Sequence, residues 1–415
     1  MALVDRIRRH IGDPALMLAA LAMAAFGVAM VYSAGHGLEP NPRLAGLWRA
    51  QGLWLGISVI AFFLLIRIPV QWYEWAAIPL YVISLILLAS TLVIGTGRGT
   101  AAGIKSWIDL GPLAFQPSQF ANIATVLMLA RVIGGWRDTP KSIWDLWKPV
   151  AVVALPLGLI MLQPDVGTAM VLGGVLLATL FWGGVPAGIL FMLISPLLAL
   201  FLSIEVWLFS IYMLLLIAFV YFYRAYLWES VVVVGANLAA GTVALPLWNS
   251  LQPYQKNRFL VFLDPTVDPQ GAGYQVIQSR IAIGSGGIFG KGFTLGTQKG
   301  LNFLPEPHTD FIFAVVGEEL GFVGAVAVVL GFGFILWRMT GVGERTPDPF
   351  AGIVVFGIFG AWFAHVLVNI GMTIGLMPIT GIPLPFLSYG GSFLLANFIA
   401  LALVQRVASE EATMR

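Results

Sequence analysis

A carboxylate flanked by apolar residues is the first candidate for chemistry. Asp264 lies in the segment RFLVFLDPTVDPQGAGYQ, where aromatic and aliphatic residues precede it and Pro265 fixes the turn after it. We expect partial desolvation at the edge of this apolar surface to raise the pKa of Asp264, which suits a general base. The alternative is an Asp-Pro turn initiator, which residue statistics alone favour, and Asp268 fits that alternative better.

Basic residues in the same region are candidates for binding an anionic ligand. They accompany a Gly-rich run, AIGSGGIFGKGF. Phosphate oxygens are held by Arg forks, by Lys point charges and by Gly-rich backbone amides. A phosphate-bearing ligand and an ordinary solvated loop explain these charges about equally well. The candidates are Arg258, Arg280, Lys291 and Lys299.

Two further segments carry candidate polar groups next to expected helix starts. In GIKSWIDLGPLAFQPSQFAN, Lys105, Trp107 and Asp109 could line the mouth of a site, although Trp107 fits an interfacial aromatic belt equally well. In LQPDVGTA, Asp165 separates two apolar runs. An acid there is either functional or a helix cap, and capping is the safer expectation.

The segment LPEPHTDFIFAVVGEELG concentrates acids and an imidazole around another helix start. Glu306, His308 and Asp310 fall just outside an apolar run, and Glu318 and Glu319 fall within it. Two adjacent carboxylates at that depth are costly unless they face a cavity or find donors.

A third polar pair and a broken segment follow. His365 and Asn369 are one helical turn apart and share a face, either in a site or in helix-helix hydrogen bonds. After them, LMPITGIPLPFLSYGGSF is a Pro- and Gly-broken re-entrant candidate, tolerated only where protein or a cavity surrounds it.

The composition shows which solvent surrounds these groups. Hydrophobic residues make up 59% of the 415 residues and charged residues 10%, with a mean hydropathy of +0.90, whereas an ordinary soluble domain has roughly 25% charged residues. Most of the exterior must therefore face lipid, and we expect one membrane-embedded domain over 1–415. The net charge of +2 gives no reason to expect nucleic acid, and the absence of cysteine excludes disulfides and thiolate chemistry.

Apolar runs predict an all-α polytopic membrane protein with about 12 transmembrane helices. An even number places both termini on one side, and the distribution of Lys and Arg favours the cytoplasm. The first run, after Arg6, Arg8 and Arg9, is read as a retained span rather than a signal peptide. The expected spans are 14–34, 51–67, 76–95, 117–133, 149–162, 166–182, 186–203, 205–223, 230–247, 311–337, 350–374 and 387–407.

A long external loop over 249–310 joins the ninth and tenth expected spans and carries the candidate active site. Its Lys and Arg residues oppose the charge bias, but loops of this length escape that rule. A connection this long is usually functional. The stretch 274–283 predicts a short helix that lies at the interface or folds back onto the bundle.

Four segments together resemble one known family. FLDPTVDPQGAGYQVIQSRIAIGSGGIFGKG, GTQKGLNFLPEPHTDFIFAVVGEELG, QPDVGTA and GIPLPFLSYGGS are similar to successive signatures of the shape, elongation, division and sporulation (SEDS) family. They occur in family order along nearly the whole chain. AIGSGGIFGKGFTLGTQ and LMPITGIPLPFLSYGG resemble the elongation members more than the division members.

This resemblance implies a peptidoglycan glycosyltransferase that polymerises lipid II at the outer face of the bacterial inner membrane during elongation. It also implies a class B penicillin-binding protein transpeptidase as partner, together with other elongation-complex membrane proteins. The family's catalytic aspartate falls on Asp264, and its functional cavity tryptophan falls on Trp107. The expected substrate contacts are Trp107, Lys105, Arg258, Arg280, Lys291, Lys299, Glu306, His308 and Asp165.

The chain departs from the family pattern in two places. Gln119 and Asn122 stand where relatives usually carry Glu and Lys, so a charge pair of the family cavity is absent. Relatives usually have about ten spans. Here 186–247 is expected to hold three crossings instead of one, and the extra hairpin leaves Asp264 outside.

The expected reaction follows from lipid II, whose anionic head is joined to a lipid tail. Asp264 would accept the proton of the acceptor sugar's 4-hydroxyl, which attacks the anomeric carbon bearing the pyrophosphate. Loop cations, with a divalent cation (Mg²⁺ or Mn²⁺), would stabilise the leaving group. The alternatives are a lipid II flippase, a division-type SEDS polymerase and a non-enzymatic scaffold, although we find none of the internal repeats that mark secondary transporters.

Overall fold

Helices form almost all of the regular secondary structure in the described residues. The computed structural model describes residues 10–36, 44–97, 106–111, 113–223, 226–251, 253–268, 271–301, 303–304 and 306–414. Its long helices are α2 (Pro14–Gly35), α3 (Leu47–Leu65), α4 (Val70–Ile94), α5 (Pro117–Gly134), α6 (Trp147–Leu162), α7 (Val166–Trp182), α8 (Ala187–Leu202), α9 (Val206–Tyr223), α10 (Leu227–Ser250), α14 (Ile312–Arg345), α15 (Pro349–Ile374) and α16 (Gly391–Met414).

Each expected span coincides with one of these helices. Within the described ranges, nine helical stretches are long and apolar enough to cross a membrane, and α7 and α8 are shorter apolar helices. The all-α polytopic class is therefore confirmed, and the exact number of crossings stays a prediction. The shorter elements are β1 (Ile108–Leu110), β2 (Leu113–Phe115), η2 (Ile143–Leu146), α11 (Pro253–Leu263), η3 (Pro265–Val267), α12 (Ala272–Ser285) and α13 (Thr297–Gly300).

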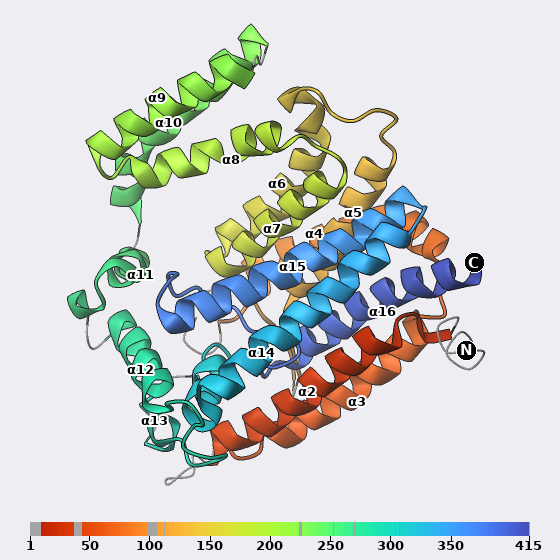
Figure 1. The fold of residues 1–415 in the computed structure, drawn as a ribbon, viewed down its shortest axis with the longest axis vertical. Coiled ribbons are helices and arrows are strands. Elements are labelled where there is room, and N and C mark those ends of the chain that lie inside the picture. Colours follow the sequence, from red (N-terminus) through yellow and green to blue (C-terminus); the bar gives the residue numbers. More distant parts are fainter. Residues whose placement is uncertain are drawn as a thin grey trace.

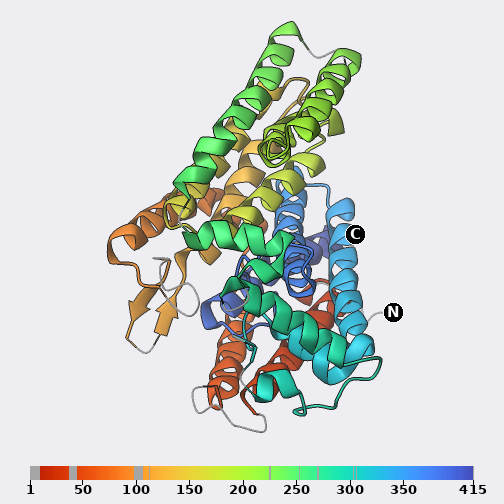
Figure 2. The same ribbon diagram turned by 90° about the vertical axis from the view of Figure 1, so that its left-hand side faces the viewer.

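The two ends of the helical bundle differ. The start of α2 and the end of α16 lie at one end, which we call the terminal end, and α11, α12 and α13 lie at the opposite end, the loop end (Figure 1). Figure 2 looks onto the loop end, where the antiparallel hairpin of β1 and β2 also lies. The structure therefore separates the long loop from both termini, which agrees with nine expected crossings before the loop and three after it.

Helices α15 and α16 form the centre of the bundle. In the most apolar 18-residue stretch of each helix, 72% of the residues of α15 and 78% of those of α16 are buried. Small residues let α7 approach α15 closely: a Cβ at Gly174 would lie 2.8 Å from that of Ala364, and one at Gly360 would lie 2.5 Å from that of Ala178. In a membrane the hydrophobic effect does not drive helices together, because lipid tails are as apolar as the side chains. Small residues let the helices approach closely and gain van der Waals contact instead.

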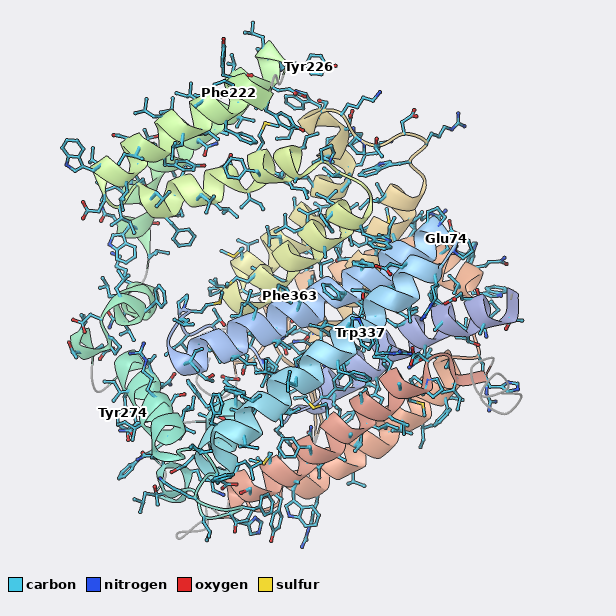
Figure 3. All side chains as sticks on the ribbon, viewed as in Figure 1. Glu74, Phe222, Tyr226, Tyr274, Trp337 and Phe363 are labelled. Atoms are coloured by element: carbon cyan, nitrogen blue, oxygen red, sulfur yellow. The ribbon has the colours of Figure 1, made fainter. Side chains whose placement is uncertain are left out.

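The additional helices α8, α9 and α10 form a group held together by buried polar side chains. Asn237 donates to the Ser195 hydroxyl and accepts from the Tyr212 hydroxyl, both at 2.8 Å. All three side chains are buried, so these hydrogen bonds connect the three helices internally. Phe222 and Tyr226, 80% and 68% exposed, lie at the outer edge of this group (Figure 3). Such an edge suits contact with lipid.

The Pro- and Gly-broken segment 376–390 is non-helical, as expected, and its stretch 384–388 is buried. Gly375 ends α15 in the left-handed conformation, with φ 76°. Asn369 donates to the carbonyls of Ile382 (2.7 Å) and Asp310 (2.9 Å), and the His365 ring lies 3.0 Å from the Pro383 carbonyl. From α3, Gln51 donates to the Ser388 carbonyl and accepts from the Gly390 amide. His365 and Asn369, on one face of α15, therefore bind two backbone carbonyls of this segment.

Asn369→Ala should destabilise the protein by about 2 kcal/mol, because it removes the hydrogen bonds that Asn369 donates to the carbonyls of Ile382, which is buried, and Asp310, which is partly buried. The matched control is Asn397→Ala, which removes one bond to Phe393 within the same helix, at 2.9 Å. We expect a drop of several degrees in the apparent melting temperature in detergent for the first variant and a clearly smaller drop for the second. Equal melting temperatures would show that Asn369 does not hold segment 376–390.

Candidate active site at the loop end

Asp264 begins a turn between α11 and α12. Its Oδ1 accepts hydrogen bonds from the Thr266 hydroxyl (2.7 Å) and the Thr266 amide (2.9 Å), so it caps η3. The carboxylate is exposed. These bonds, the hydroxyl first and the amide second, hold the pKa of Asp264 below its usual range. The expectation of a desolvated carboxylate with a raised pKa is therefore wrong, because the apolar neighbours in the sequence do not cover it.

Asp268, four residues later, has a structural role. Its carboxylate accepts from the Gly271 amide at 3.0 Å and from the Asn257 side chain at 3.2 Å. It thereby closes the turn into α12, which fits the turn-forming role expected for it. The two Asp-Pro pairs thus differ: Asp264 sits on an exposed turn, and Asp268 holds α11 against the start of α12.

The Asp264 turn rests on segment 376–390. Val261 of α11, Val276 of α12 and Ile379 form a small buried cluster. From α12, Ser279 donates to the Thr373 carbonyl (2.7 Å), and Arg280 donates to the Gly375 carbonyl (3.0 Å). The helix expected over 274–283 therefore exists as α12 and packs on the bundle. Arg280 is exposed and available for an anion, while also binding the carboxyl end of α15.

The segment 306–310 reaches the same support. The Tyr389 amide donates to the His308 carbonyl at 2.8 Å, and the Ser388 hydroxyl donates to the Thr309 carbonyl at 2.6 Å. The rings of His308 and Tyr389 lie 5.4 Å apart. Segment 376–390 thus joins the Asp264 turn to the His308 segment, although about a hundred residues separate it from the first.

Burial shifts both ionisable groups of the 306–308 pair toward neutrality. It lowers the pKa of His308 to about 4 and raises that of Glu306. His308 Nε2 lies 3.7 Å from a Glu306 oxygen, too far for a hydrogen bond. At neutral pH we therefore regard His308 as uncharged, and the two side chains as neighbours rather than an ion pair.

Lys291 and Lys299 neutralise the two adjacent glutamates of α14. Lys291 Nζ lies 2.7 Å from Glu318, and Lys299 Nζ lies 2.5 Å from Glu319. The Ser33 hydroxyl of α2 also donates to Glu319, and Lys299 donates to the Ser33 hydroxyl and carbonyl. The side chains of Lys299 and both glutamates are at most 1% exposed. The structure thus pairs both lysines with buried glutamates, and the Lys291 side chain stays 26% exposed. Contact of these lysines with an external anion stays a prediction.

Trp107 pairs with Thr96 in an isolated β-bridge next to the β1–β2 hairpin, and the sequence predicted neither. It exchanges backbone hydrogen bonds with Thr96 after α4, at 2.8 and 3.2 Å, and the Thr96 hydroxyl donates to Asp109 at 2.8 Å. Stacking of Phe115 on Phe120, at 4.8 Å, then joins β2 to α5. Trp107 is half-buried. The bridge to Thr96 therefore fixes the Trp107 backbone beside the end of α4.

The remaining candidates divide into three groups. Asp165 caps α7 by accepting from the Thr168 amide (3.0 Å) and hydroxyl (2.8 Å), as expected for the safer alternative. Lys105 and the side chain of Arg258 lie outside the described residues. Gln119 and Asn122 are buried in α5, and no hydrogen-bond partner is found for the Asn122 Oδ1 within the described ranges.

The acids and imidazoles of the described residues do not gather into a metal-binding set. In the described part of the chain, no three Asp, Glu or His side chains are placed to hold one ion. Mg²⁺ prefers carboxylate and phosphate oxygens. The expected divalent cation therefore has no dedicated site among these residues and stays a prediction.

The sequence matches known proteins over nearly its whole length. The family model for FtsW, RodA and SpoVE, described as cell cycle protein, matches residues 14–214 and 208–413. The chain is 34% identical to the peptidoglycan glycosyltransferase MrdB of Escherichia coli K12, covering 95% of this chain and 93% of the relative. It is also 34% identical to the peptidoglycan glycosyltransferase RodA of Treponema pallidum, covering 95% and 97%.

Solved structures share the fold. One belongs to a peptidoglycan synthase complex that coordinates polymerization and crosslinking; it has a TM-score of 0.70 and 32% identity over 96% of this chain and 98% of that one. The rod shape determining protein RodA of Thermus thermophilus has a TM-score of 0.63 and 27% identity over 96% and 97%.

The buried pair of Lys299 and Glu319 should behave as a unit. Lys299→Met or Glu319→Gln alone should each cost about 3 kcal/mol, because the remaining charge is buried without its partner. The double variant should cost clearly less than the two single costs added together. Thermal unfolding of the four proteins in detergent measures this coupling. Additive losses would show that the two side chains do not stabilise each other.

Proposed function

The chain belongs to the SEDS family of FtsW-, RodA- and SpoVE-like proteins, and from this premise we propose that it polymerises lipid II into peptidoglycan glycan strands, with Asp264 as general base. Relatives that match almost its full length are peptidoglycan glycosyltransferases, and we assign the same enzymatic activity to this chain. The observation that carries the role of Asp264 is its position on an exposed turn at the loop end, braced against the core by segment 376–390.

The position of the turn suits the substrate. Lipid II has its diphosphate at the membrane surface and its polyprenyl tail in the bilayer, so its reacting carbon lies near the interface. The loop end is the end of the bundle from which both termini are absent (Figure 1). We place the termini in the cytoplasm and the loop end at the outer face of the inner membrane, where lipid II is polymerised.

Asp264 is in the charge state that a base requires. Because Thr266 holds its pKa low, the carboxylate is ionised at neutral pH. Binding of the acceptor sugar would displace water from this exposed group and increase its proton affinity when the hydroxyl is in place. The carboxylate takes the proton of the 4-hydroxyl, the oxygen bonds to the anomeric carbon, and the bond to the diphosphate breaks. The product link is β-1,4, with inversion.

The departing diphosphate needs positive charge from the protein. Lys291 and Lys299 are occupied by glutamates, which leaves Arg280 as the described loop cation best suited to this role. Its backbone belongs to α12, which begins a few residues after the Asp264 turn. Preorganised positive charge is most effective where negative charge develops.

Partner proteins complete the proposal. A relative of this fold works in a synthase complex that coordinates polymerization and crosslinking. We infer that a class B penicillin-binding protein crosslinks the strands that this chain makes, alongside other elongation-complex membrane proteins. The elongation assignment, over the division type, rests on the signature segments.

Asp264→Asn should abolish glycan synthesis, since an amide cannot accept the acceptor proton, with a loss of about 100-fold or more in rate. The matched control is Asp268→Asn, which changes the second Asp-Pro pair and should retain activity. A gel of products from lipid II and each purified variant, with and without the partner, measures both. Wild-type rates in the Asp264 variant would remove this residue from the reaction.

Thr266→Val should change the pH dependence of the reaction. The variant loses the hydroxyl that contributes most to the low pKa of Asp264, so this pKa should rise. Protonated Asp264 cannot act as base, and the acid limb of the rate profile should move to higher pH. The pH dependence of kcat/KM tests this, with Thr242→Val as a control that loses a hydroxyl bonded within α10, to the Ala239 carbonyl. An unmoved acid limb would argue against Asp264 as the titrating group.

A further inference from the structure

The loop 286–296, called here the Gly-rich loop, is bound to α14 through the backbone. Helix α14 breaks at Gly321, where φ is 67° and ψ is −161°. Around the break, the Phe322 amide donates to the Gly287 carbonyl (2.9 Å) and the Val323 amide to the Ile288 carbonyl (3.1 Å). In return, the Lys291 and Gly292 amides donate to the carbonyls of Glu318 and Glu319, both at 3.0 Å. The loop thus replaces the helical hydrogen bonds lost at the break.

Glycine is required at this contact. A Cβ at Gly286 would lie 2.0 Å from the Gly317 carbonyl oxygen, and one at Gly290 would lie 2.1 Å from that of Glu319. A Cβ at Gly321 would meet the Gly290 amide nitrogen at 2.3 Å. Two backbones approach here without room for side chains, so the loop has a fixed seat on α14.

The Gly-rich loop directs its charge inward and its apolar side chains outward. Its one charged residue, Lys291, is paired with Glu318. Four large apolar side chains are exposed instead: Ile288 (63%), Phe289 (82%), Phe293 (45%) and Leu295 (62%). An exposed apolar group of this size without charges is unfavourable in water and marks a contact surface.

This surface continues onto a membrane span. Phe322 and Val323, bonded to the loop, are 68% and 52% exposed, and Val329 and Leu330 continue the exposed apolar face along α14. From Gly321 to Arg338, near the terminal end, α14 rises about 25 Å, close to the thickness of a hydrocarbon core of about 30 Å. Arg338 is paired with Asp13 before α2. The Gly-rich loop therefore lies at the boundary of the hydrocarbon at the loop end.

We propose that the Gly-rich loop is a membrane-inserted wedge, with Ile288, Phe289, Phe293 and Leu295 in contact with the acyl chains of the leaflet at the loop end. The ion pair of Lys291 with the buried Glu318 and the glycine contact fix it at one height on α14. Since the loop is continuous with α12, the wedge also sets the height of the Asp264 turn above the hydrocarbon. This last consequence, unlike the lipid contact, rests on the proposed function.

The absence of cysteine allows a direct test with single labels. Phe289→Cys, and independently Leu295→Cys, are labelled with an NBD maleimide and reconstituted without any partner. The vesicles contain phosphatidylethanolamine, phosphatidylglycerol and a phosphatidylcholine with a doxyl quencher either near the headgroup or in the middle of the acyl chain. Leu330→Cys, about 13 Å farther along α14 from Gly321, is the deep control. Asp138→Cys, exposed between α5 and η2, is the aqueous control.

The wedge predicts shallow lipid contact. Labels at 289 and 295 should be quenched at least about twofold more than the label at 138, and more by the shallow than by the deep quencher. The label at 330 should show the opposite order. Quenching at both loop positions no greater than at 138 would overturn the proposal and leave the surface to a protein partner. Because no catalytic step enters, loss of the proposed enzymatic function would not affect this result.

Discussion

Two ion pairs to buried glutamates, Lys291 with Glu318 and Lys299 with Glu319, are the interactions on which the loop end depends. A carboxylate cannot remain charged inside an apolar bundle without a partner, so the glutamates of α14 require cations from another segment. The lysines come from the loop before α14, and Ser33 adds the end of α2 to the second pair. The cost of burying charge thereby fixes the loop on the helices. A site in this region is therefore fixed to the helical core, although its residues belong to the loop between α10 and α14.

Segment 376–390 provides the second support. Its backbone forms hydrogen bonds with His365 and Asn369 of α15 and with Gln51 of α3. Its outer surface then carries the Asp264 turn through Ile379 and the His308 segment through Ser388 and Tyr389. Non-helical backbone is tolerated here because protein groups satisfy it. The exposed Asp264 carboxylate therefore lies on a turn that the core supports. This arrangement suits a general base that must reach an incoming sugar.

The sequence predicted the features that arise from local pattern. Apolar runs located the long helices, and the position of Asp165 between two such runs made a helix cap the safer expectation, because both follow from neighbouring residues. It failed where partners are distant along the chain. Lys299 resembles a solvated or phosphate-binding lysine until α14 folds Glu319 against it. Of the apolar residues before Asp264, Val261 is buried but Leu263 is 71% exposed, so they do not cover the carboxylate, and the hydrogen bonds from Thr266 lower its pKa instead. The break at Gly321 is compensated by a loop some thirty residues earlier, so no local pattern announced it.

The central claim is that this chain itself forms glycosidic bonds, rather than moving or organising lipid II for another enzyme. The most direct measurement is incubation of the purified wild-type protein with lipid II in detergent micelles, where no bilayer remains to be crossed. Formation of a polymer that a muramidase degrades to disaccharide units is the result we predict. Complete recovery of unreacted lipid II, both alone and with the transpeptidase partner present, would contradict the claim and favour a flippase or a scaffold.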